Sequence, residues 1–138
     1  MTEPNWIDKE FVLLLHERII EKTGGCHGMR DETLFESALS RPQHAHHYEQ
    51  ADIYSLAAAY AEAIARNHPF IDGNKRTALA TADMFLENNG YQIGVEKDNE
   101  REPLFLGLAE GKVSRAELAE WYRENTQELI KSNSGFMN

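Results

Sequence analysis

The stretch "ADIYSLAAAYAEAIARN", residues 51–67, decides the architecture that we expect for this chain. Its apolar residues recur at helical spacing, and its many alanines allow neighbouring helices to approach closely. This pattern predicts a buried central helix. The segment "HPFIDG", residues 68–73, interrupts the helical pattern, and a second helix is predicted from Asn74 to Asn88, where "NNG" ends it.

Two helices are predicted before the central one. Asp8 can cap a helix that runs to about Lys22, after which "TGGCHGMRD" breaks the pattern with closely spaced glycines. Asp31 can cap a short second helix that ends near Arg41, because the next residue is a proline. We interpret the following "PQHAHHYEQ", residues 42–50, as a loop.

Further helices are predicted after the central pair. The segment "YQIGV", residues 91–95, is interpreted as a short extended piece, and helices are predicted over 98–110 and from the cap Ser114 to Lys131. The fold class that we expect is all-α, a compact bundle of about six helices with a small flap. We expect one domain over residues 1–131 and a frayed C-terminal tail over 132–138.

Composition and charge narrow the class of protein. The chain of 138 residues is 41% hydrophobic and 27% charged, which is typical of a single globular domain. Its net charge of −9 opposes direct binding to nucleic acid or to anionic membranes. The single cysteine, Cys26, excludes an internal disulfide framework, and the acidic N-terminus lacks the layout of a signal peptide. We therefore expect a cytoplasmic protein without a membrane segment.

The start of the predicted helix 74–88 carries two cations, Lys75 and Arg76. The N–H groups of a first turn have no partner inside the helix, and the helix dipole adds partial positive charge there. Cations at this position oppose the dipole unless an anion binds, and phosphate is the anion that such a turn accepts best. Gly73 allows a ligand to approach the backbone closely. The sequence therefore predicts a phosphate site.

Four neighbouring residues complete a chemical site. Histidine as a residue type exchanges protons near neutral pH, so His68 is a candidate to take a proton from an attacking hydroxyl. Asp72 offers a hard oxygen ligand that suits Mg²⁺ beside nucleotide phosphates. Asn74 can donate from its amide to a phosphate oxygen, or it can cap the helix. We expect Phe70 to point into the core and to fix the loop.

The motif "HPFIDGNKRT", residues 68–77, resembles the signature loop of the Fic/Doc (fido) superfamily. Members of this superfamily transfer part of a nucleoside triphosphate to a hydroxyl group of a target protein. The segment 15–39 is similar to the first helix and glycine-rich flap of the family, and 78–91 is similar to the helix after the motif. The resemblance covers nearly the whole chain and implies the fido fold in its short, Doc-type version.

Two positions indicate the branch of the family. The adenylylating Fic branch typically reads HPFx(D/E)GNGRxxR, whereas this chain has Lys75 at the second glycine and Leu79 at the final arginine. Both departures resemble the Doc, or death-on-curing, branch, whose members are toxins of bacterial toxin–antitoxin pairs and phosphorylate elongation factor Tu on a threonine. In that branch the lysine is understood to turn the γ-phosphate of the nucleotide toward the target hydroxyl. Pro69 and Gly73 are more similar to the Fic pattern.

The resemblance implies a role for each matched residue. His68 would be the general base, Asp72 would bind Mg²⁺, and ATP would be the substrate that donates the transferred group. The phosphates and the nucleotide would be held by Gly73, Asn74, Lys75, Arg76, Arg66 and Lys22. The flap glycines would position the target segment through backbone contacts, although a flexible connector would contain the same residues, Gly24, Gly25 and Gly28.

The same resemblance implies how the protein is regulated. Self-inhibited Fic proteins carry an (S/T)xxxE(G/N) helix, and here Leu106 stands four positions before Glu110-Gly111, where that pattern needs Ser or Thr. The implied inhibitor is therefore a separate Phd-like antitoxin whose C-terminal tail docks on an exposed apolar groove.

Three functions follow as competing hypotheses. The leading one is a Doc-like toxin of a toxin–antitoxin system, which transfers the γ-phosphate of ATP to a Ser/Thr hydroxyl of a protein, with elongation factor Tu as the expected target. The second is a protein adenylyltransferase, and the third is a non-catalytic module that acts by binding its antitoxin.

Two other features are given structural interpretations. The segment "HAHH", residues 44–47, offers metal ligands, but no Cys, Asp or Glu at suitable spacing joins it, so we interpret it as a polar loop. Cys26 lies beside His27 without a carboxylate to orient it, which argues against a nucleophile. Trp121 and Tyr122 are expected in the core.

Overall fold

The computed structural model describes residues 3–94 and 98–129 of the chain. These residues form six helices and one two-stranded sheet, so the all-α class and the number of helices are confirmed. In chain order the elements are α1 (Lys9–Thr23), α2 (Glu32–Glu49), α3 (Ile53–Asn67), α4 (Asn74–Asn88), β1 (Tyr91–Ile93), α5 (Asp98–Ala109), α6 (Arg115–Asn125) and β2 (Thr126–Glu128).

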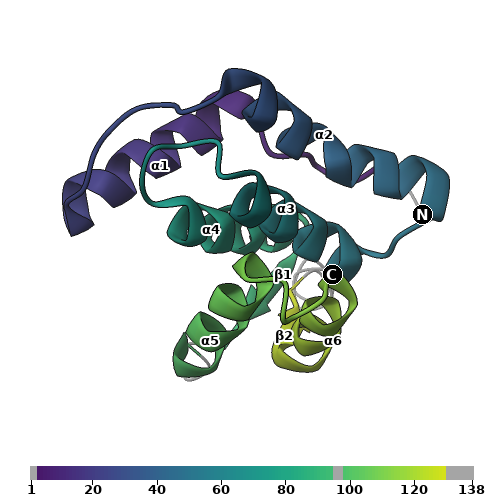
Figure 1. The fold of residues 1–138 in the computed structure, drawn as a ribbon. Helices are drawn as coiled ribbons and strands as arrows, with labels where there is room; N and C mark the ends of the chain where they lie inside the picture. Colours follow the sequence, from purple (N-terminus) through teal and green to yellow (C-terminus); the bar gives the residue numbers. More distant parts are fainter. Residues whose placement is uncertain (1–2, 95–97, 130–138) are drawn as a thin grey trace.

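Helix α3 is the centre of the fold, as its alanine-rich sequence predicts. Figure 1 shows α1 and α2 on one side of the α3–α4 pair and α5 and α6 on the other. Most of α3 is buried, including six alanines whose exposed fractions are 0–1%. Small side chains let α2, α4, α5 and α6 all pack against this one helix.

The predicted end of α2 at Arg41 is wrong. The helix continues through Pro42 to Glu49, so residues 42–49 are helical and only Gln50, the C-cap, lies outside the helix. The buried stripe of this helix explains the difference, because it continues across the proline with Phe35, Ala38, Pro42 and Ala45. Burial of this face outweighs the hydrogen bond that a proline removes from a helix interior.

The predicted end of α6 at Lys131 is also wrong. The helix ends at Asn125, and β2 then pairs antiparallel with β1, with Ile93 opposite Thr126. Side chains satisfy the last helical carbonyls, since Thr126 Oγ1 donates to Tyr122 O at 2.8 Å and Asn125 Nδ2 donates to Trp121 O at 2.8 Å. The extended piece after α4 is confirmed for β1, while the predicted tail over 132–138 lies outside the described residues.

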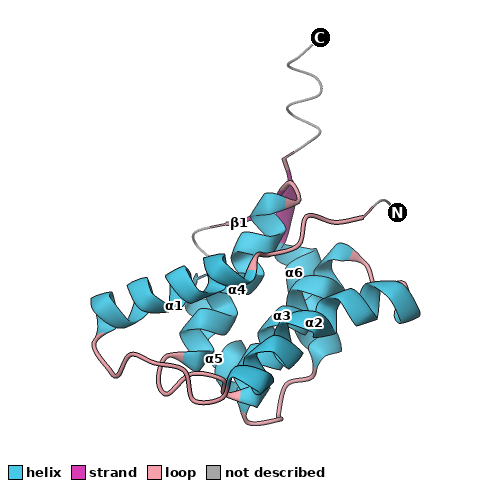
Figure 2. Cartoon of the chain, turned by 90° about the horizontal axis from the view of Figure 1, so that it is seen from above, coloured by secondary structure: helices cyan, strands magenta, loops and turns pink. Residues whose placement is uncertain are grey.

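Two connections far apart in sequence lie side by side at one edge of the bundle. The α1–α2 connection forms a short antiparallel bridge with the α3–α4 connection, through Met29 and Phe70 (Figure 2). Ile71 N donates to Gly28 O at 3.1 Å. The predicted flap therefore contacts the predicted phosphate loop directly. Within residues 3–94 and 98–129, no helix is long and apolar enough to span a membrane.

Candidate functional site

The N-terminus of α4 is an uncapped helix start with two cations. The helix begins at Asn74, as predicted, and its N-cap Gly73 adopts a left-handed conformation with φ 78° and supplies no side-chain cap. Lys75 and Arg76 are exposed, and neither forms a salt bridge within the described part of the chain. First-turn N–H groups, the dipole and two free cations thus favour an anion at the same place.

His68 lies at the other end of the same connection, as the C-cap of α3. Its side chain is exposed, and its backbone is left-handed, with φ 49° and ψ 57°. This conformation is uncommon for a residue other than glycine, and the following Pro69 restricts the backbone further. Such a conformation persists only where surrounding contacts fix it, and residues of this kind cluster at functional sites.

Asp72 connects the loop to two other parts of the molecule. Its Oδ2 accepts a hydrogen bond from Cys26 N in the flap at 2.9 Å, and its backbone oxygen lies 2.8 Å from His16 Nε2 on α1. The position beside Gly25 is tight, because a Cβ added at Gly25 would lie 3.3 Å from Asp72 Oδ2. The flap and α1 therefore fix both the direction of the carboxylate and the backbone that carries it.

The carboxylate of Asp72 fits a magnesium ion. It is exposed, and its Oδ1 forms no hydrogen bond within the described residues. These residues contain no group of three or more His, Cys, Asp or Glu that could hold a metal on their own. One or two carboxylates completed by substrate phosphates and water are the usual ligands of Mg²⁺.

His16 of α1, which was not predicted from the sequence, contacts two residues of the loop, Phe70 and Asp72. It is 5% exposed, and its ring stacks on Phe70 with 3.8 Å between the ring centroids. Burial lowers the pKa of His16 from its ordinary value of 6.5, against the opposing hydrogen bond to Asp72. The signal was its spacing, because it shares one face of α1 with the buried Val12 and Ile20.

The side chain of Asn74 holds the loop in shape. It is 7% exposed, its Oδ1 accepts from Phe70 N at 2.9 Å, and its Nδ2 donates to Phe70 O at 2.9 Å. The buried Phe70 is fixed to the core as predicted, with an exposed fraction of 2%. The amide of Asn74 is thus engaged with the protein in both directions, and its phosphate contact stays a prediction.

Three further groups of predicted residues surround this loop. Arg66 lies in the last turn of α3, and its Nε donates to Leu108 O of α5 at 3.3 Å. Lys22 lies exposed in the last turn of α1 and forms no salt bridge within the described residues. The flap glycines all have positive φ, with values of 82°, 114° and 118° for Gly24, Gly25 and Gly28. The roles predicted for these residues stay predictions.

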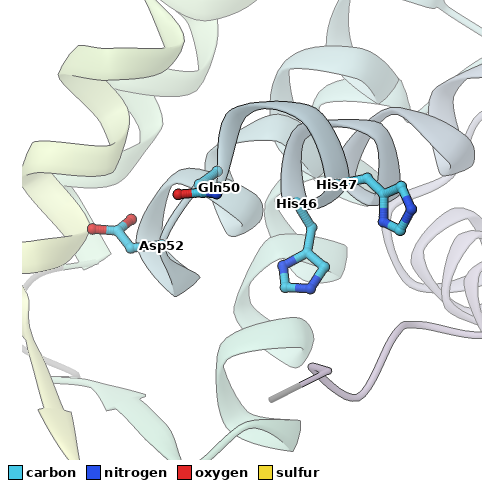
Figure 3. A pocket seen from close by; sticks show the side chains of 5 residues that line it. His46, His47, Gln50 and Asp52 are labelled. Carbon is cyan, nitrogen blue, oxygen red and sulfur yellow. The ribbon is translucent and has the colours of Figure 1, made fainter. Parts of the chain in front are cut away.

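A pocket of about 560 Å³ lies away from this loop. Figure 3 shows His46 and His47 of α2 with Gln50 and Asp52, which line it together with Ala51. Asp52 is the N-cap of α3 whereas His68 is its C-cap, so roughly 20 Å of helix separates the pocket from the loop. The predicted polar loop at "HAHH" is wrong, because these histidines belong to α2.

Comparison with known proteins identifies the family of this chain. The described residues form six helices, and the connection between α3 and α4 carries an exposed histidine, a carboxylate and a cationic helix start. This combination indicates a class of helical proteins that bind phosphate groups at this connection. The chain belongs to the Fic/DOC family, whose model matches residues 6–86 and so includes the flap and the loop. The resemblance stated from the sequence is confirmed.

Two curated relatives cover most of the chain. It is 38% identical to the "Protein kinase doc" of Escherichia phage P1 over 118 residues, which are 85% of this chain and 92% of the relative. It is 39% identical to the "Toxin Doc" of Mycolicibacterium smegmatis over 103 residues, which are 73% of this chain and 75% of the relative.

Proposed function

We propose that this chain is a Doc-type toxin that transfers the γ-phosphate of ATP to a Ser/Thr hydroxyl of a protein in the cytoplasm. Elongation factor Tu is the first target to test, and inhibition of translation is the expected consequence. The observation that carries the proposal is the connection 68–73, which has the exposed His68 at one end and the uncapped, cationic start of α4 at the other. Two relatives whose names include a protein kinase and a toxin support it.

The start of α4 would hold the phosphates. First-turn N–H groups donate to phosphate oxygens, and Lys75 and Arg76 add charge-assisted hydrogen bonds. In phosphoryl transfer the protein mainly positions the reactants and stabilises charge, and these groups supply both effects. Asp72 would hold Mg²⁺, which when bound neutralises charge on the phosphates.

His68 would act as the general base. Its imidazole takes the proton from the target hydroxyl, whose oxygen forms a bond to the γ-phosphorus. The bond between that phosphorus and the bridging oxygen breaks, ADP leaves with the electron pair, and the imidazolium later returns its proton to water. The flap would present the target segment beside this base, because the flap is bonded to the loop at Ile71 and Asp72.

A Phd-like antitoxin is the inhibitor that we propose. The similarity to a protein named as a toxin supports a separate partner of this kind. Titration of the antitoxin encoded beside this gene against the purified chain should show binding that lowers transfer to the target. An absence of binding at high concentrations of both proteins contradicts this part of the proposal.

Intact mass spectrometry tests the reaction. The chain is incubated with ATP, Mg²⁺ and elongation factor Tu, and the mass of the target is expected to rise by one phosphate. His68→Ala should reduce the rate by roughly 10²–10⁴-fold, since that is the usual contribution of a general base. The control is His44→Ala, an exposed histidine on α2 that lies far from the loop in sequence and should leave the rate unchanged.

The same measurement separates the other two hypotheses. Adenylyl transfer retains support from Gly73, the residue that the adenylylating pattern has at the N-cap of α4, and it would add a nucleotide mass in place of a phosphate. A non-catalytic module would leave the target mass unchanged. In that case His68→Ala would still arrest growth when expressed.

A further inference from the structure

A residue of the flap, Arg30, reaches the C-terminus of α3. Its Nε donates to His68 O at 2.6 Å, and its Nη2 donates to Asn67 O at 2.8 Å. Asn67 is the last residue of α3 and His68 is its C-cap. One guanidinium group thus bonds to two consecutive carbonyls at the place where the helix ends and the candidate base begins.

The contact is chemically well matched. The last carbonyls of a helix lack partners inside it and carry partial negative charge, so a cation there is favourable. Guanidinium presents several N–H donors in a rigid planar fork, which lets it bond to both oxygens at once. A lysine offers one compact ammonium group on a flexible arm and cannot reproduce this geometry.

The backbone of the flap extends the same contact by one residue. Arg30 N and Asp31 N both donate to Pro69 O, at 2.7 Å and 3.1 Å. The carbonyls of Asn67, His68 and Pro69 therefore all accept hydrogen bonds from the flap. At the other end of the loop, the Asn74 side chain forms two hydrogen bonds with the backbone of Phe70. Hydrogen bonds therefore restrain the backbone on both sides of Pro69.

This restraint matters because of the backbone conformation of His68. A left-handed residue other than glycine before a proline costs free energy, and it persists only where other contacts fix it. The direction of the Cα–Cβ bond follows from that backbone, so the contacts that fix the backbone also aim the imidazole. Arg30 provides two of these contacts with a single side chain.

We propose that Arg30 is a positioning residue that holds Asn67 and His68 in place and thereby aims the His68 imidazole at the reacting hydroxyl. This inference rests on the proposed function of His68 as the base. Because the flap also bonds the carboxylate of Asp72 through Cys26 N, one segment fixes both the base and the candidate metal ligand. A target that engages the flap would then meet chemical groups that are already placed.

A spectroscopic experiment tests the contact without any reaction. Uniformly isotope-labelled wild type, Arg30→Met, Arg30→Lys and Arg41→Met are compared by NMR, with His68→Ala to assign the His68 ring signals. Arg41 is an exposed arginine of α2 without a salt bridge among the described residues, so it is a matched control. Both Arg30 variants should move the His68 ring signals and speed amide exchange at Phe70 and Ile71, whereas Arg41→Met should not.

Identical His68 signals and exchange rates in wild type and both Arg30 variants would overturn the proposal. Rescue by Arg30→Lys would also contradict it, because a charge alone would then suffice. This arm does not depend on catalysis, so it remains decisive even if the wild-type chain transfers nothing and the proposed function fails.

Steady-state kinetics test the consequence for the reaction. Arg30→Met should lower kcat by at least about tenfold, because small misplacements of a catalytic group are costly. The KM for ATP should change by less than about threefold, since the proposed phosphate contacts come from the start of α4. A rise in KM as large as the fall in kcat would show that Arg30 acts on the nucleotide, and would overturn the positioning role.

Discussion

The first turns of α3 and α4 place opposite charges at the positive end of the helix dipole. At α3 the N-cap Asp52 accepts a hydrogen bond from Ser55 N at 2.9 Å and pairs with Arg123 Nη2 at 2.7 Å. At α4 the N-cap is Gly73, which has no side chain, and the first turn carries Lys75 and Arg76. The dipole of α3 is complemented by a carboxylate, whereas that of α4 is opposed by two cations.

Other helices of the fold resemble α3 in this respect. The Asp31 side chain accepts from Leu34 N at the start of α2, and Ser114 and Glu117 form a reciprocal capping box at the start of α6. The start of α4 therefore differs from the capped starts of α2, α3 and α6. The start of α1 also lacks a side-chain cap, but its first turn carries the acidic Glu10, whereas the first turn of α4 carries two cations. An arrangement that lowers stability in the free protein, and that an anion would reverse, is a stronger sign of function than the cations alone.

The largest effect is expected at the residue that stabilises the start of α4 in place of a cap. Asn74→Ala leaves Phe70 N and Phe70 O without their partners in a buried setting. Each unsatisfied group costs about 1–3 kcal/mol, so the free energy of unfolding should fall by about 2–4 kcal/mol in urea denaturation.

The matched variant for this prediction is Asn74→Asp. It keeps the acceptor for Phe70 N and loses the donor to Phe70 O, so it should also destabilise the fold. A change below about 0.5 kcal/mol for both variants, typical of an ordinary surface site, would show that Asn74 does not hold the loop.

The second effect concerns binding. Arg76→Gln removes an exposed cation that has no salt bridge within the described residues, so the fold should be little changed. The affinity for Mg²⁺–ATP should fall by roughly 10–100-fold, because a hydrogen bond to a charged group contributes about 1.5–3 kcal/mol. Isothermal titration measures the loss, and Arg41→Gln is the control. Equal affinities for wild type and Arg76→Gln would contradict the phosphate site at α4.

The difference between the two helix starts also explains what the sequence could reveal. Gly73 and the apolar helical pattern that follows it mark the start of α4 correctly, since both of these signals are local. The central role of α3 can also be predicted, because many alanines at helical spacing allow neighbouring helices to approach closely. The loop residues that resemble the family motif were found for the same reason.

The sequence could not reveal contacts that depend on tertiary packing. The two hydrogen bonds of Arg30 to the end of α3 join residues 37 and 38 positions apart in the chain. His16 contacts Asp72 because α1 packs against α4, and no local sequence pattern connects these two residues. The proline in α2 misled the prediction, because its local cost is outweighed by burial that only the folded chain defines.

A smaller effect tests the conventional helix start. Asp52→Ala removes the cap of α3 and the ion pair with Arg123, so the free energy of unfolding should fall by about 0.5–2 kcal/mol. Asp8→Ala is the matched control, because Asp8 is the N-cap of α1 and its side chain makes no capping hydrogen bond. If both variants lose the same free energy of unfolding, the hydrogen bond and the ion pair of Asp52 do not contribute to stability.

The contribution of Asp52 should also depend on pH. The pKa of Asp52 is lowered from its ordinary value of 3.8: burial acts to raise it, and the hydrogen bonds from Arg123 and Ser55 outweigh that effect. A carboxyl whose pKa is depressed in the folded state stabilises the fold above its unfolded pKa and loses this contribution as pH falls through the folded value. The difference in Tm between wild type and Asp52→Ala should therefore be constant near neutral pH and shrink below about pH 3.8.

The smallest expected effect is a difference in stability between wild type and Lys75→Glu. It is also the most specific test of the comparison between α3 and α4, because the sign of this difference should reverse when Mg²⁺–ATP binds. Lys75→Glu replaces a cation that opposes the dipole of α4 by an anion that complements it, so the free protein should gain about 0.3–1 kcal/mol of stability. Arg41→Glu makes the same change of charge within α2 and should not stabilise the chain. Saturating Mg²⁺–ATP stabilises whichever protein binds it, so wild type should then become the more stable of the two in thermal melts. If wild type is more stable than Lys75→Glu even without nucleotide, the cations at the start of α4 do not destabilise the free protein. The difference between the starts of α3 and α4 would then not indicate an anion site.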